Sequence, residues 1–82
     1  MPSPHANLLD YHLGLMYQAT HLNGPPASMV LRIFREALEA DQELRRVAEQ
    51  RAAGISDHLA KRDFISKRHR DFLRQALAME PV

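Results

Sequence analysis

The sequence predicts an all-α fold: a three-helix antiparallel bundle with a long central helix, in one domain that spans residues 1–82. Apolar residues recur three and four positions apart through most of the chain, which is the period of an amphipathic helix. No stretch alternates in the manner of a strand, and turn-forming residues divide the helical pattern at two places. We therefore expect helices at about 4–22, 26–53 and 56–79.

The first helix is predicted to begin at Ser3 and Pro4, which suit an N-cap and a first helical position, with Asn7 as a second possible cap. The prolines and the glycine of the Asn23–Pro26 segment end it. Its apolar residues cover more than half of the circumference, so we expect it to be the most buried helix. Gly14 costs this helix about 1 kcal/mol relative to alanine. We therefore expect another backbone to approach closely at Gly14.

The second predicted helix, residues 26–53, is the longest, and no glycine or proline interrupts its interior. It would extend ~40 Å, which is long for a domain of this size. One face of this helix is an apolar seam of Val30, Ile33, Ala37, Ala40, Leu44 and Val47. We expect the first half of the helix to lie in the core, and the second half to pair with a second copy or a partner helix in a narrower, coiled-coil-like contact. Gly54 suits a left-handed residue just after the helix. A break at Asp41, a favourable N-cap residue, is the alternative.

The third predicted helix, residues 56–79, has Ser56 as its N-cap and Asp57 favourably placed in its first turn. We expect a core-facing stripe of apolar residues: Ile55, Leu59, Ile65, Phe72, Leu73, Ala76 and Leu77. The same stripe also contains His58, Arg62 and His69.

The composition narrows the possible classes of protein. The chain has no cysteine, which excludes disulfides and thiolate chemistry, and its net charge is +1. We expect a cytoplasmic protein without membrane contact, because the start of the chain does not resemble a signal peptide and no long apolar run occurs. Acidic residues prevail up to Gln50, and basic residues prevail from Arg51 onward.

No residue pattern predicts catalysis, a metal site or a cofactor. The serines suit caps or helix surfaces, and no glycine-rich phosphate loop occurs. His12, His58 and His69 do not have the close spacing of a metal-binding pair. We interpret them as half-buried, hydrogen-bonded side chains, with a pH-sensitive contact as the alternative. We therefore expect no catalytic residue, metal ligand, cofactor or small-molecule substrate.

The predicted function is protein–protein interaction, by a small regulator, adaptor or chaperone-like subunit that dimerises or receives a partner helix. Phe64 lies off the core stripe, between Lys61 and Arg68, where an aromatic ring bordered by charges can anchor a partner. Burial of Phe64 by the second helix or by another subunit is the alternative. With the seam residues Leu44 and Val47, these three residues form the predicted partner-binding set.

A nucleic-acid-binding transcriptional regulator is the alternative function. Basic residues along the third helix could contact phosphates, namely Lys67, Arg70 and Arg74. The Ala53–Ser56 segment resembles the turn of a helix-turn-helix domain, although Glu49 and Gln50 stand where that motif usually has an apolar and a small residue. Asp63 and Asp71 are spaced to pair with Lys67 and would repel phosphate, so the sequence favours a solvated helix face over nucleic-acid binding for these basic residues.

Overall fold

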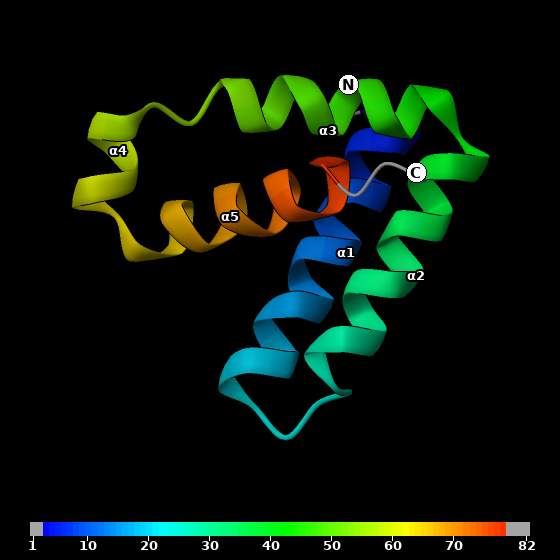
Figure 1. The fold of residues 1–82 in the computed structure, drawn as a ribbon, viewed down its shortest axis with the longest axis horizontal. Helices are drawn as coiled ribbons and strands as arrows, with labels where there is room; N and C mark the ends of the chain where they lie inside the picture. Colours follow the sequence, from blue (N-terminus) through cyan, green and yellow to red (C-terminus); the bar gives the residue numbers. More distant parts are fainter. Residues whose placement is uncertain (1–2, 79–82) are drawn as a thin grey trace.

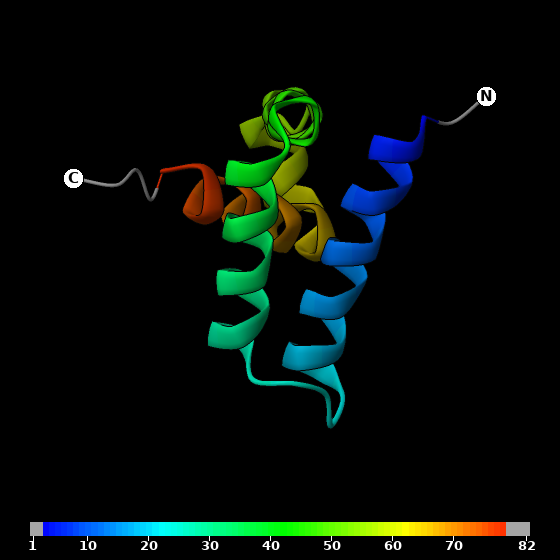
Figure 2. The same cartoon turned by 90° about the vertical axis from the view of Figure 1, so that its right-hand side faces the viewer.

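The computed structural model describes residues 3–78, which form five helices: α1 (Pro4–His21), α2 (Ala27–Ala40), α3 (Gln42–Ala53), α4 (Asp57–Arg62) and α5 (Phe64–Ala78). The helices α1 and α2 form an antiparallel hairpin, and α3 and α5 run across it with α4 turning the chain between them (Figure 1). Figure 2 shows α3 and α5 lying against one end of the hairpin. The predicted all-α class is confirmed, whereas the three-helix bundle with a long central helix is wrong.

The predicted central helix is broken at Asp41, as the alternative proposed. The backbone of Asp41 is extended, with φ −135° and ψ 100°. Its N–H donates to the Ala37 carbonyl at 3.0 Å, which closes α2. Its Oδ1 accepts hydrogen bonds from the N–H groups of Glu43 and Leu44 at 3.1 and 3.2 Å, which caps α3. A carboxylate here satisfies N–H groups that the first turn of a helix leaves without partners, so one residue ends α2 and begins α3.

The start of α1 is tied to this junction through His5. The Nε2 atom of His5 lies 3.1 Å from Oδ2 of Asp41. Both oxygens of the carboxylate therefore have partners, one in the backbone of α3 and one in α1. The side chains of this pair are 34% and 39% exposed, so solvent screens the charge interaction and its contribution to stability is small.

The predicted third helix is also broken, at Asp63, and the sequence analysis did not anticipate this break. Oδ1 of Asp63 accepts a hydrogen bond from the Ile65 N–H at 3.1 Å, and its Oδ2 accepts one from the Ser66 hydroxyl at 2.7 Å. The Ser66 hydroxyl makes the largest contribution to lowering the pKa of Asp63, and backbone N–H groups add to it. The predicted end of this helix, Met79, lies outside the described residues.

The break at Asp63 changes which residues face the core. Three residues of the predicted stripe are buried: Phe72, Leu73 and Ala76. Leu59 and Ile65, however, are 40% and 49% exposed, because α4 and the start of α5 project beyond the hairpin (Figure 1). His58 and Arg62 are exposed, and His69 is half-buried.

The two predicted serine caps are confirmed. Ser3 accepts a hydrogen bond from the Ala6 N–H at 3.0 Å, and Ser56 accepts one from the Leu59 N–H at 3.1 Å. These contacts satisfy donors in the first turns of α1 and α4, so the starts of both helices follow from local sequence.

Two expectations about glycines are wrong. Gly54 has φ −76° and is right-handed, so the end of α3 does not require a left-handed residue. A Cβ atom added to Gly14 would meet no atom within 4 Å, so no neighbouring backbone approaches it closely. The close approach occurs instead at Gly24, where a Cβ atom would lie 2.9 Å from the backbone carbon and oxygen of Gln18.

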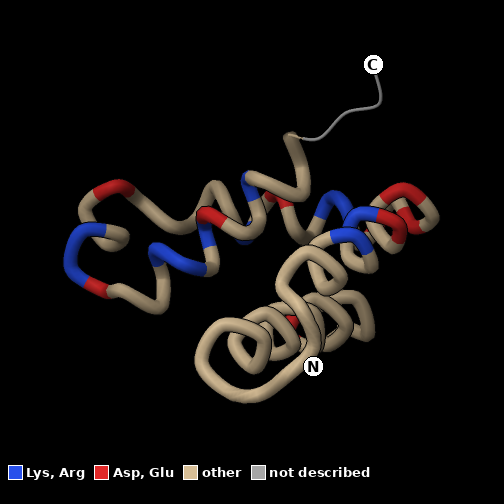
Figure 3. The backbone as a smooth tube through the Cα atoms, turned by 60° about the horizontal axis from the view of Figure 1, so that its bottom comes forward, with Lys and Arg blue, Asp and Glu red and all other residues tan. Residues whose placement is uncertain are grey.

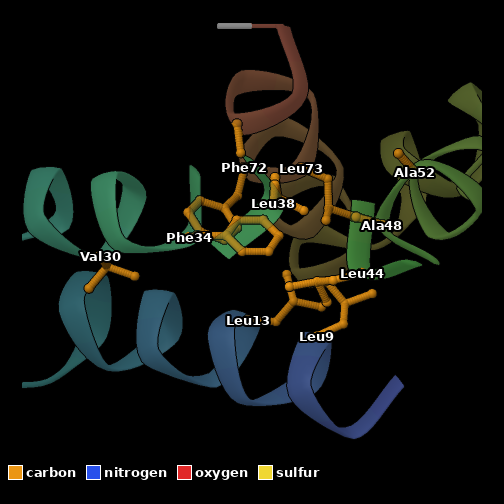
Figure 4. Close-up of a cluster of buried hydrophobic side chains, with 11 residues drawn as sticks. Leu9, Leu13, Val30, Phe34, Leu38, Leu44, Ala48, Ala52, Phe72 and Leu73 are labelled. Atoms are coloured by element: carbon orange, nitrogen blue, oxygen red, sulfur yellow. The ribbon is translucent and has the colours of Figure 1, made fainter. Parts of the chain in front are cut away.

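The core lies where α3 and α5 cross the hairpin (Figure 4). The ring of Phe34 stacks on Phe72 at 5.0 Å between centroids and contacts His12 at 4.9 Å. Four helices contribute side chains with almost no exposed surface: Leu9, Val30, Phe34, Leu38, Leu44, Ala48 and Leu73. Truncation of such a buried leucine to alanine typically costs about 2–5 kcal/mol. The break at Asp41 therefore places the first half of α3 in the chain's own core.

The first prediction concerns the cap at Asp41. We expect Asp41→Ala to lower the free energy of unfolding by about 1–2 kcal/mol, because the first N–H groups of α3 lose their acceptor. The control Asp41→Asn keeps a capping oxygen and should cost less. Urea denaturation followed by circular dichroism measures both values. Equal losses in the two variants would show that the cap is not the main contribution of Asp41.

The second prediction is a loss of stability in mild acid. His12 is 4% exposed, its Nδ1 has no hydrogen-bond partner among the described residues, and burial lowers its pKa below the ordinary 6.5. The unfolded chain therefore binds this proton more readily than the folded chain. The free energy of unfolding should fall as the pH drops through about 6.5 and level off below the folded-state pKa.

Urea denaturation at a series of pH values measures this effect, and His12→Leu is the matched variant. The variant should show a shallower dependence, with a remainder from His69, whose pKa burial also lowers. If the free energy of unfolding of His12→Leu fell with pH as steeply as that of the wild type, His12 would not be the source of the acid sensitivity.

Candidate partner-binding groove

A narrow, mainly apolar groove separates the C-terminal half of α1 from the N-terminal half of α5. Eight residues line this α1–α5 groove: Leu13, Met16, Tyr17, Thr20, His21, Ile65, Arg68 and His69. Its enclosed volume is about 10 Å³, which is room for roughly one water molecule. A bound molecule would therefore lie along the groove and contact its rim, and a large side chain would not enter it fully.

Phe64 lies at the edge of this groove and is 59% exposed. Its ring meets the His21 ring edge-on at 6.4 Å between centroids, and His21 in turn stacks on Tyr17 at 4.4 Å. The guanidinium carbon of Arg68 lies 5.5 Å from the centroid of the Phe64 ring, within the range of a cation–π contact. The predicted residues Phe64 and Arg68 are thus brought together, one helical turn apart.

The α1 side of this cluster was not predicted from the sequence. Tyr17 and His21 are one turn apart in α1, and the Thr20 hydroxyl lies 2.8 Å from Nδ1 of His21. Two aromatic rings at this spacing were a signal that they share one face of the helix. Nothing in the sequence, however, indicated that this face lies next to Phe64.

Arg68 differs from the basic residues on the other side of α5. Nζ of Lys67 lies 2.9 Å from a carboxylate oxygen of Asp71, and Nη1 of Arg70 lies 2.6 Å from a carboxylate oxygen of Asp57. Arg68 has no carboxylate within 4.0 Å in the part of the chain that the structure describes. Its charge is therefore available to a bound molecule.

His69 lines the groove as a mainly neutral ring at neutral pH. Burial lowers its pKa first, and the Arg51 guanidinium lowers it further, while Asp63 and Asp10 act in the opposite direction. Arg68 is the one lysine or arginine among the residues that line the groove.

The rest of the predicted partner-binding set does not join the groove. Leu44 is fully buried in the core, so its prediction as a contact for a partner is corrected. Val47 is partly buried and packs against the same core. Lys61 lies beside a different hollow, between α4 and α5.

This second hollow, of about 460 Å³, is wide and open, and its lining includes two of the predicted phosphate contacts. It is lined by Asp57, Ala60, Lys61, Lys67 and Arg70. Figure 3 shows basic and acidic residues alternating along α4 and the start of α5. Arg74 is exposed and does not line the hollow.

Comparisons with protein families, with curated proteins and with solved structures gave no match for this chain. Within residues 3–78, no group of three or more histidine, aspartate or glutamate side chains is arranged to hold a metal ion. None of the helices in that range combines the length and the apolar character needed to cross a bilayer.

Proposed function

We propose that this protein is a small interaction domain, an adaptor or regulator without catalytic chemistry, that binds an amphipathic segment of another protein in the α1–α5 groove. The observation that carries the proposal is Phe64, 59% exposed and held at the edge of an apolar groove by rings and a guanidinium. Aromatic and arginine side chains contribute a large share of the binding energy in protein interfaces.

The groove is also ordered before any partner arrives. The stack of Tyr17 on His21 and the contact between Thr20 and His21 limit the rotamers on the α1 side. The cap at Asp63 fixes the start of α5, on which Phe64 and Arg68 lie. A surface that is already ordered loses less conformational entropy on binding, which favours affinity.

Homodimerisation along the predicted apolar seam is not part of this proposal. The sequence suggested a dimer because, in one continuous helix over residues 26–53, Leu44 and Val47 would have had no other helix of the same chain to pack against. Leu44 is enclosed in the chain's own core and Val47 packs against it, so this reason for a dimer no longer holds.

The third prediction tests the groove with a display library of random peptides selected against the wild-type protein. Peptides that bind should shift the NMR signals of groove residues. We expect Phe64→Ala to weaken their binding at least about tenfold, because the aromatic anchor is lost. The helical circular dichroism signal should stay unchanged, since Phe64 is exposed.

Ile33→Ala is the matched control, because Ile33 is 43% exposed on α2 and does not line the groove. It should bind the selected peptides as the wild type does. Peptides that bind Phe64→Ala with wild-type affinity would contradict the proposal.

The second candidate function is nucleic-acid binding, and one observation favours it: Lys61, Lys67 and Arg70 line the same hollow. Lys67 and Arg70, however, already form ion pairs with Asp71 and Asp57, which weakens this candidate. The fourth prediction is that a labelled DNA duplex shows little binding by fluorescence anisotropy, even at about 50 mM salt. Binding that falls by orders of magnitude between about 50 and 200 mM salt would instead favour nucleic acid.

A further inference from the structure

We infer that the segment bound in the α1–α5 groove is acidic, with apolar residues over the groove and a carboxylate that pairs with Arg68. This inference rests on the proposed function, because it specifies the chemistry of the partner at the same site. It follows from the charges around the groove, from the shape of the groove and from the position of Arg68 at its edge.

The carboxylates near the groove already have partners. Asp10 is the only aspartate, glutamate, lysine or arginine in α1, and its Oδ1 lies 3.1 Å from Nη1 of Arg51. Asp63 accepts hydrogen bonds from Ile65 and Ser66 in the cap of α5. No described carboxylate therefore competes for Arg68, which a partner can reach from the groove.

The position of Arg68 makes a carboxylate the favoured partner group. Its guanidinium lies over the ring of Phe64, so the exposed apolar anchor and the available cation are adjacent. A segment that covers Phe64 would also remove water from around Arg68. A charge-assisted hydrogen bond from a carboxylate would satisfy the guanidinium there, whereas a basic or apolar neighbour would leave it without an acceptor.

The length of the groove lining suits a short segment that lies along it. Its α1 wall runs from Leu13 to His21, which corresponds to roughly 12 Å, or about two helical turns. Ile65 and His69 form part of the opposite wall on α5. A bilayer surface could reach the exposed Phe64 but would not follow a narrow strip between two helices, so a peptide fits the site better than a lipid surface.

The fifth prediction uses three labelled peptides of about 16 residues that share one pattern of leucines at helical spacing. The remaining positions are glutamate in the first peptide, glutamine in the second and lysine in the third. We expect the glutamate peptide to bind the full-length protein at least about tenfold more tightly than the lysine peptide, with the glutamine peptide between them. Fluorescence anisotropy measures the affinities, and NMR shift changes at groove residues locate the site.

Charge reversal at Arg68 tests the pairing directly. Arg68→Glu should weaken binding of the glutamate peptide at least about tenfold and strengthen binding of the lysine peptide. Arg74→Glu is the matched control, because it makes the same change of net charge at an exposed position of α5 outside the groove. It should change both affinities only slightly, and circular dichroism checks that both variants are folded.

The outcomes separate this inference from the proposed function. Equal binding of all three peptides in the groove, lost in Phe64→Ala, would overturn the acidic preference and leave the proposed function intact. Equal effects of Arg68→Glu and Arg74→Glu would overturn the pairing with Arg68. If no peptide, designed or selected, shifted groove signals, the proposed function itself would fail. Binding to phosphatidylserine vesicles through Phe64, without binding of the glutamate peptide, would replace the peptide with a lipid surface.

Discussion

The carboxylate of Asp41 is the contact on which the rest of the structure depends. It caps α3 and receives His5 from α1, while the backbone N–H of the same residue closes α2, so three helices meet at one residue. Because the chain turns there, α3 runs across the end of the hairpin, and Leu44 and Ala48 are fully buried. A continuous helix would have carried these residues past the hairpin and left an apolar seam for another molecule to cover. The turn converts that seam into part of the chain's own core.

Asp63 repeats the same chemistry at the other end of the molecule, with a different result. Its cap begins α5 at Phe64, and the turn places α4 and the first residues of α5 beyond the hairpin. Leu59 and Ile65 become partly exposed, and Phe64 comes to lie beside the rings of α1. One aspartate therefore completes the core, and the other creates an exposed aromatic surface on a helix with an ordered start.

The distribution of ion pairs separates the two faces of α5. On one face Lys67 and Arg70 have carboxylate partners, and the Arg70 side chain is only 12% exposed. On the face toward α1, Arg68 has the Phe64 ring as its neighbour. The net charge of the whole chain, which is +1, does not reveal this difference between the two faces. The proposal of a protein partner over a polyanion therefore rests on the local arrangement, an apolar groove with one available cation at its edge.

The sequence by itself determined the all-α class, the serine caps, the end of the first helix and the proximity of Phe64 to Arg68, because each depends on residues within a few positions of one another. Only the tertiary structure decided whether Asp41 and Asp63 lie inside helices or break them. An aspartate is tolerated inside a solvated helix and favoured as an N-cap. Whether the helix continues or breaks at the aspartate therefore depends on which apolar residues the resulting turn buries. Likewise, only the packing of α5 near α1 brings Phe64 next to Tyr17 and His21. The same holds for Leu44, which is buried by residues that are distant from it in the chain.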